Sequence, residues 1–200
     1  MPKKEAAPKL SSKNFRERAL QELLALRNEV IDLATGRDIY WRVEREVIQC
    51  NPRLLSIRSA YLDMVRGAYA DAMSSRVRRL IDKGRPTISL RRLLVELRGY
   101  PELFCNRVAP AELERDIEEL HRTTRKIKDF GDQHVAHHQR NPVATVPTHR
   151  ELNEGIDTLI AVLRKYYSIL AGSDLSLVIE YLEEPLAIFR FPWIEPKVHS

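Results

Sequence analysis

Apolar residues recur along this chain at intervals of three and four residues, and this spacing constrains the fold more than any other feature. The first such segment begins at Phe15, and its apolar face is formed by Ala19, Leu23, Leu26, Val30 and Leu33. A recurrence near 3.6 residues is typical of an amphipathic α-helix. No segment shows the alternation of apolar and polar residues expected of a strand. The sequence therefore predicts an all-α fold, an antiparallel bundle of long helices joined by short loops.

Glycine and proline divide the first half of the chain into helices. Gly36 is expected to kink or interrupt the first helix, which resumes over residues 39–48. Asn51-Pro52 opens a second long helix over residues 52–82, which the Lys83-Gly84-Arg85-Pro86 turn ends. The apolar face predicted for this second helix comprises Ile57, Tyr61, Val65, Ala68, Ala72, Val77 and Leu80. A short helix is predicted over residues 89–97.

Two further helices are expected in the second half. Pro110 opens the first, whose buried stripe comprises Leu113, Ile117, Leu120, Thr124 and Ile127 and, if the helix continues unbroken, Gly131, His134 and His138. Thr148 with Glu151 three residues later forms a capping box, which marks the start of the last long helix. The buried face predicted for that helix comprises Leu152, Ile156, Leu159, Leu163, Tyr166 and Leu170, and Gly172 ends it.

These segments suggest three regions. Residues 1–14 are rich in lysine, proline and serine and are predicted to be a disordered tail. Residues 15–172 form the helical domain. Residues 173–200 are predicted to contain a helix between Ser173 and Leu182, followed by an extended strap in which prolines alternate with Phe189, Phe191 and Trp193. The strap is expected to pack on the core or on a second subunit.

Composition narrows the class of protein. Apolar residues make up 44% of the chain and charged residues 30%, which is typical of a globular protein. No apolar run approaches the roughly 18 residues that suggest a membrane span. Cys50 and Cys105 form neither a metal-binding spacing nor a disulfide framework. A cytoplasmic protein without a membrane partner is therefore expected.

The groups best suited to chemistry at neutral pH are crowded near the end of the helix that Pro110 opens. Three of the six histidines, His134, His137 and His138, lie within five residues of one another and close to Asp132. Imidazole titrates near neutrality, so these residues suggest acid/base catalysis, a pH switch or a metal site that Asp132 or His149 would complete. Partly buried structural histidines, or histidines favoured by a helix C-terminus, are the alternative. No third metal ligand is defined, and no cofactor is predicted.

Positive charge is concentrated in one window. Residues 76–98 contain eight basic residues and two acids, a net +6, whereas the whole chain carries +5. This window suggests binding to RNA or another polyanion, with Arg79, Arg91 and Arg92 as candidate contacts. The alternative is a solvated helix surface whose arginines pair with the acidic turn over residues 112–119.

Several of these segments together resemble the HEPN superfamily, in particular its AbiU-like, phage abortive-infection branch. The resemblance covers roughly residues 15–170 and rests on Arg79-Leu80-Ile81-Asp82, Ser89-Leu90, the short helix ending at Leu97, and His134-Val135-Ala136-His137. It implies HEPN-like topology, a homodimer, and a role directed at RNA in prokaryotic phage defence or stress response. Active members are metal-independent endoribonucleases whose motif is an arginine, four to six intervening residues and a histidine, with the two motifs of a dimer meeting across its axis.

This chain departs from that motif at the arginine. If His137 is the motif histidine, Gly131 and Asp132 stand where the arginine is expected, and no arginine lies between residues 126 and 139. A ribonuclease site would then use His137 as acid/base, Asp132 as its orienting neighbour and His134 nearby. Its cation would come from Lys128, Arg125 or Arg140.

A second motif match and a second function remain open. Arg115 and His121 match the motif spacing literally, but they lie inside a predicted helix without the Ala-His context. The competing function is a catalytically inactive module that binds a nucleotide, RNA or a protein partner such as an antitoxin.

Overall fold

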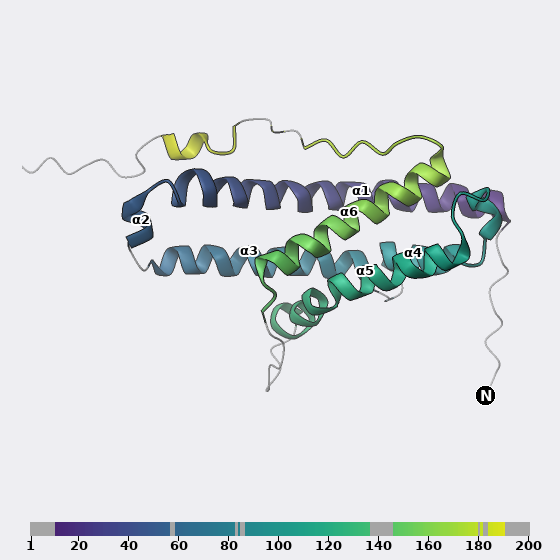
Figure 1. The fold of residues 1–200 in the computed structure, drawn as a ribbon, viewed down its shortest axis with the longest axis horizontal. Helices are drawn as coiled ribbons and strands as arrows, with labels where there is room; N and C mark the ends of the chain where they lie inside the picture. Colours follow the sequence, from purple (N-terminus) through teal and green to yellow (C-terminus); the bar gives the residue numbers. More distant parts are fainter. Residues whose placement is uncertain are drawn as a thin grey trace, which may run out of the picture.

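The fold is seen in a computed structural model that describes residues 11–56, 59–82, 84, 87–136, 146–179, 181 and 184–190. For residue 55 and residues 134–136 it describes the backbone alone. Helices dominate, and no strand occurs among these residues, which confirms the all-α prediction. Figure 1 shows α1 and α3 running side by side in opposite directions, with α5 and α6 crossing them obliquely.

Helix α1 (Ser12–Arg42) passes without interruption into a π-helix, η1 (Val43–Ile48). Ser11 caps α1 by accepting the Asn14 backbone N–H at 3.3 Å, so the helix begins inside the segment predicted as a tail. The predicted kink at Gly36 is wrong. A Cβ at this position would lie 2.8 Å from Met73 Cε, so the missing side chain of Gly36 leaves room for the end of the Met73 side chain.

The predicted helix over residues 52–82 is two helices, α2 (Pro52–Ser56) and α3 (Ala60–Ile81). Ser59 has extended backbone angles and caps α3 by accepting the Leu62 N–H, which separates the two. The predicted apolar face was partly wrong, because Tyr61, Ala68 and Ala72 are exposed. The side chains that α3 buries are Tyr69, Ala70, Met73, Ser74, Val77, Leu80 and Ile81.

The remaining helices complete one core. They are α4 (Leu90–Leu97), the 3-10 helix η2 (Pro101–Phe104), α5 (Pro110–Phe130) and α6 (His149–Ala171). Helix α6 packs against both α1 and α5, and α5 packs against α3. All six residues predicted for the buried face of α6 are buried, as are the five predicted for α5 before Gly131. Gly172, at φ +75°, ends α6 as predicted.

The capping box at the start of α6 also ties this helix to α5. The Glu151 carboxylate accepts the Thr148 backbone N–H at 2.7 Å, and Lys126 Nζ lies 2.8 Å from both of its oxygens. The hydrogen bond from Lys126, followed by that from the Thr148 backbone, lowers the pKa of Glu151 to about 2. Its ordinary pKa is 4.5, so the carboxylate binds a proton less readily in the folded chain than in the unfolded chain.

We therefore expect Glu151 to contribute a stabilisation that is complete above about pH 4.5 and is lost as the pH falls toward about 2. The measurement is the difference in melting temperature between the native chain and Glu151→Gln as the pH is lowered from neutrality. This difference should be constant near neutral pH and shrink in acid. A difference that is independent of pH would show that the charge of Glu151 does not stabilise the fold.

After α6 the chain runs back along α1 in extended form. The contacts are Arg27 Nε to the Ser176 carbonyl at 2.8 Å, the Tyr181 hydroxyl to Asp38, and Arg42 to Glu184 at 2.6 Å. A 3-10 helix, η4 (Ala187–Arg190), follows. The helix predicted between Ser173 and Leu182 is therefore wrong over the described residues there, which are not helical. The described part of the strap packs on its own α1 (Figure 1).

Candidate functional site

Helix α5 changes its geometry just before the histidines. After Phe130 it continues as a π-helix, η3 (Gly131–Ala136), in which hydrogen bonds span five residues instead of four. Of the predicted stripe through Gly131, His134 and His138, Gly131 is buried as expected, whereas the His134 side chain and His138 lie outside the described residues. His134 lies on η3, but its side chain, together with all of His137, His138 and Arg140, lies outside the described residues. π-Helical turns occur frequently at functional sites.

Two cations from different helices meet the carboxylate of Asp132 on η3. Arg78 of α3 donates through Nε to Oδ1, and Lys128 of α5 donates through Nζ to Oδ2. The side chains of Arg78, Asp132 and Lys128 are 31%, 31% and 29% exposed, so solvent or a ligand can reach all three. We call this group the Asp132 triad. It brings together two predicted site residues, Asp132 and Lys128, and adds Arg78.

The triad fixes the ionisation of its carboxyl group. Burial opposes ionisation of Asp132, but hydrogen bonds from Lys128 and Arg78 outweigh burial and hold its pKa below the usual value. Asp132 is therefore an ionised acceptor at neutral pH and cannot serve as a general acid. Two cations and one carboxylate leave the triad with one net positive charge.

The triad also retains hydrogen-bond donors. A guanidinium has five N–H groups and an ammonium three. Among the described residues, Arg78 uses one of these donors on Asp132, and Lys128 likewise uses one. The remaining donors of both cations can bind phosphate oxygens.

Comparison with protein families identifies the family of the chain. The HEPN_AbiU2 family model, described as AbiU2, matches residues 17–187. The chain belongs to the HEPN AbiU2 family. No curated protein and no solved structure shows significant similarity to the chain. The family resemblance predicted from the sequence is thus confirmed.

Position 131, one of the two positions where the sequence predicts the motif arginine, has little room for a side chain. A Cβ there would lie 3.3 Å from the Ser74 carbonyl oxygen and 3.4 Å from Arg78 Cδ. Gly131 thus lets η3 lie close to the backbone of α3, and any larger side chain would displace one of them. The absence of a side chain at position 131 makes room for the stem of Arg78.

Arg78 contacts Asp132 but was not among the candidate residues predicted from the sequence. Arg78 and Asp132 are 54 positions apart, and only the packing of α3 on η3 joins them. The concentration of arginines over residues 76–98 was the available signal, but it did not distinguish Arg78 from its neighbours. Arg125, predicted as an alternative cation, is exposed and lies 3.8 Å from Asp129. Arg115 and His121, the literal motif match, are exposed on α5.

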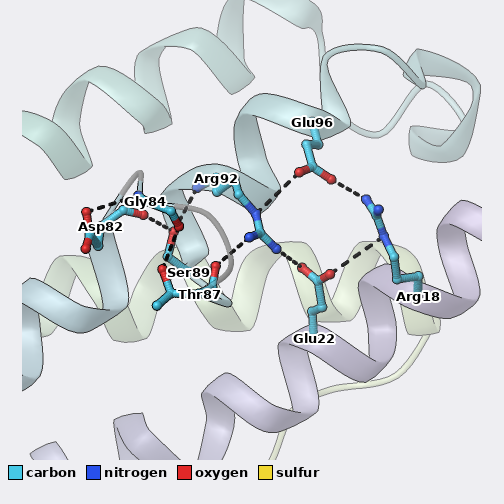
Figure 2. Close-up of polar contacts among 8 residues, drawn as sticks. All are labelled: Arg18, Glu22, Asp82, Gly84, Thr87, Ser89, Arg92 and Glu96. Carbon is cyan, nitrogen blue, oxygen red and sulfur yellow. Dashed lines mark hydrogen bonds and ion pairs between the residues drawn. The ribbon is translucent and has the colours of Figure 1, made fainter. Parts of the chain in front are cut away.

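Arg92, another predicted RNA contact, lies in a charge network between α1 and α4. Figure 2 shows its guanidinium facing Glu96 at 3.3 Å and Glu22 at 3.6 Å, with Arg18 on the far side of both carboxylates. Arg92 also donates to the Thr87 carbonyl, and its side chain is only 20% exposed. These contacts anchor the α3–α4 connection to α1, so Arg92 already has a structural role.

Three other arginines of the basic window pair with acids of α1 or α5. Arg79 lies 2.9 Å from Glu29 and Arg76 lies 3.2 Å from Asp32. Arg98 pairs with Glu114, as expected from the alternative in which arginines of this window pair with the acidic turn over residues 112–119. Burial, with a smaller effect of Arg98, lowers the pKa of Arg91. The window is therefore less positive toward solvent than its sequence suggests, and RNA binding by Arg79, Arg91 and Arg92 stays a prediction.

His149, considered as a metal ligand, lies among aromatic rings. Its ring centroid is 5.3 Å from that of Tyr40, 5.4 Å from Trp41 and 5.9 Å from Tyr69, and Nε2 lies 3.3 Å from the Tyr40 hydroxyl. In the part of the chain that the structure describes, no three histidine, cysteine or acidic side chains are grouped to hold a metal ion. None of the described helices combines the length and apolar character needed to cross a membrane.

Proposed function

We propose that this HEPN AbiU2 protein is a metal-independent endoribonuclease of prokaryotic phage defence or stress response, in which Arg78 and Lys128 replace the missing motif arginine. The observation that carries the proposal is the convergence of both cations on Asp132, five residues before His137. Cytoplasmic RNA is the substrate class, because a phosphodiester offers the negative charge that the remaining donors bind.

Each group then has a separate role. His137 exchanges a proton with the RNA 2′-hydroxyl or with the leaving oxygen, and His134 lies nearby on η3. The 2′-oxygen attacks the phosphorus, the P–O5′ bond breaks, and the product retains a 2′,3′-cyclic phosphate. Arg78 and Lys128 stabilise the charge that builds on the phosphate oxygens during this step. Asp132 orients the two cations, a role that its lowered pKa supports.

The proposal includes a homodimer, because the family places two such motifs across a dimer axis. It also includes a protein partner, such as an antitoxin, that restrains the activity. A monomer at micromolar concentration in light scattering would count against the dimeric part of the proposal.

Cleavage of a structured RNA in EDTA tests the proposal. The native chain is expected to cut the RNA despite the chelator and to leave 2′,3′-cyclic phosphate ends. His137→Ala is expected to lower the rate by about 100-fold or more, the usual contribution of a general acid or base. His121→Ala separates this site from the literal motif, because its rate should equal that of the native chain.

The alternative function is an inactive RNA-binding module, and the position of Asp132 favours it in one respect. Its carboxylate already engages both cations, so a substrate phosphate has to share them. Absence of cleavage by the native chain, with RNA binding that His137→Ala leaves unchanged, would establish this alternative. Cleavage that EDTA abolishes would contradict both functions.

A further inference from the structure

We propose that the groove between α1 and α6 around Trp41 binds a single unpaired purine nucleotide. This site lies apart from the Asp132 triad and rests on the proposed function only for its natural source, an RNA strand. The groove consists of two adjoining cavities of about 760 Å³ and 520 Å³, which share Trp41, Asn153 and Asp157 as lining residues. His149, Arg150 and Glu154 also line the first, and Arg37, Asp38 and Arg45 the second.

Trp41 offers a fixed aromatic surface. Its ring meets those of Tyr40 and His149 at interplanar angles of 79° and 84°, with centroids 5.5 Å and 5.4 Å away, so neither ring stacks in parallel on the indole. Tyr40 is itself held by parallel stacking on Tyr69, at 3.7 Å. Trp41 Nε1 donates to Asn153 Oδ1 at 3.4 Å, which fixes the indole from the side of α6. An indole fixed in this way can stack on a base at little entropic cost.

Three arginines and three carboxylates line the groove, and two of the arginines are available to an anionic ligand. Its three carboxylates already have partners: Asp38 accepts the Tyr181 hydroxyl, Glu154 pairs with Arg122 at 2.8 Å, and Asp157 pairs with Arg37 at 2.6 Å. Among the described residues, Arg45 and Arg150 have no carboxylate partner, and Arg45 Nε donates only to the Trp41 carbonyl. Two guanidinium groups therefore flank the indole and are available to a phosphate.

This combination selects the class of ligand. The Trp41 ring is half-buried but lines both cavities, and an aromatic face that a ligand can reach binds any base by stacking, with a purine presenting the larger face. Asn153 adds an amide next to the indole, and amides bind adenine edges by paired hydrogen bonds. A purine nucleotide can stack its base on Trp41, present a base edge to the Asn153 amide and place its 5′-phosphate at Arg150 or Arg45. A purely apolar ligand would not bind the guanidinium groups, and these groups would repel a cationic ligand.

Tryptophan fluorescence tests the site. The chain has two tryptophans, so Trp193→Phe leaves Trp41 as the single reporter. Adenosine 5′-monophosphate is expected to quench this emission in a saturable way, and ribose 5-phosphate, which lacks the base, is expected to bind about tenfold more weakly or worse. In the same background, Arg150→Gln should weaken binding of the nucleotide and leave the melting temperature unchanged, because Arg150 is exposed.

Arg164→Gln is the matched control. Arg164 is an exposed arginine of the same helix, 14 residues or about 21 Å along its axis from Arg150, and does not line the groove. Equal binding of the nucleotide and of ribose 5-phosphate would overturn the base site, as would equal effects of the two arginine substitutions. Because this titration uses a mononucleotide, its result is independent of RNA cleavage. Quenching without cleavage refutes the ribonuclease alone, and cleavage without quenching refutes the Trp41 site alone.

Discussion

Arg78→Gln is expected to lower the turnover rate for RNA cleavage by about 100- to 1,000-fold, the usual cost of removing one donor to a developing oxyanion. Glutamine removes the charge of Arg78 but retains a polar group at the position of Nε, the atom that donates to Asp132. The loss should appear in kcat as well as in KM, because the guanidinium binds the phosphate most strongly when charge builds on it. Single-turnover cleavage at saturating RNA measures the relevant rate.

The stability of the variant separates this role from a structural one. Arg78 and Asp132 are each about 31% exposed, and an ion pair that is partly in solvent contributes less than about 1 kcal/mol to folding. Arg78→Gln should therefore melt within a few degrees of the native chain. Arg78→Lys keeps the charge without the planar donors, so its cleavage rate should lie between those of the native chain and Arg78→Gln.

Arg164→Gln provides the control for loss of one exposed positive charge elsewhere on the surface. Native cleavage rates in Arg78→Gln would show that Arg78 does not replace the motif arginine. Lys128 would then be the remaining cation of the triad to examine.

The helices were predictable where local signals agree. The capping box of Thr148 and Glu151, the apolar face of α6 and the left-handed Gly172 all act within a few residues, and all are present. The apolar face of α3 was not predictable in the same way, because alanines and tyrosines occur around its whole circumference. Only contact with α1, α5 and α6 selects Tyr69 over Tyr61 for burial.

In the candidate site, too, contacts between residues close in sequence were predictable and contacts made by helix packing were not. Asp132 and Lys128 are four residues apart on one continuous helical segment, so their proximity follows from the sequence, whereas their role in a site stays a prediction. Arg78 enters from α3 because Gly131 leaves room for it, and this is a property of the packing of two helices. A change from α- to π-helical hydrogen bonding after Phe130 has no recognised sequence signature. The positions of residues beyond that point therefore could not be extrapolated from the α-helical stripe.

Gly155→Val is expected to destabilise the fold by about 2–3 kcal/mol, toward the upper end of the cost of overpacking a core. Gly155 lies where α6 packs closely on α5. A Cβ there would lie 2.5 Å from Ile127 Cδ1 and 3.3 Å from the Thr123 carbonyl oxygen. Ile127 is fully buried, so its Cδ1 can move only by displacing neighbouring core atoms, and the Thr123 oxygen belongs to the backbone of α5. Urea denaturation measures the change.

Gly67→Ala is the matched control for this helix–helix contact. Gly67 lies inside α3, and a Cβ there would meet nothing within 4 Å. Alanine should therefore stabilise the chain by about 0.5–1 kcal/mol, because it is the better helix former and no contact opposes it. Destabilisation by both substitutions would mean that the effect at Gly155 does not come from its contacts with α5.

A double-mutant cycle then locates the clash at one atom. Ile127→Val removes the Cδ1 atom that a side chain at position 155 would meet, and alone it should cost about 0.5–1.5 kcal/mol. Combined with Gly155→Ala, it should cost less than the sum of the two single changes, because the smaller residue vacates the space that the new methyl group needs. Strict additivity would instead assign the strain to the Thr123 carbonyl, whose position Ile127→Val does not change. The cycle thus distinguishes a side-chain clash from a limit set by the distance between the two helix backbones.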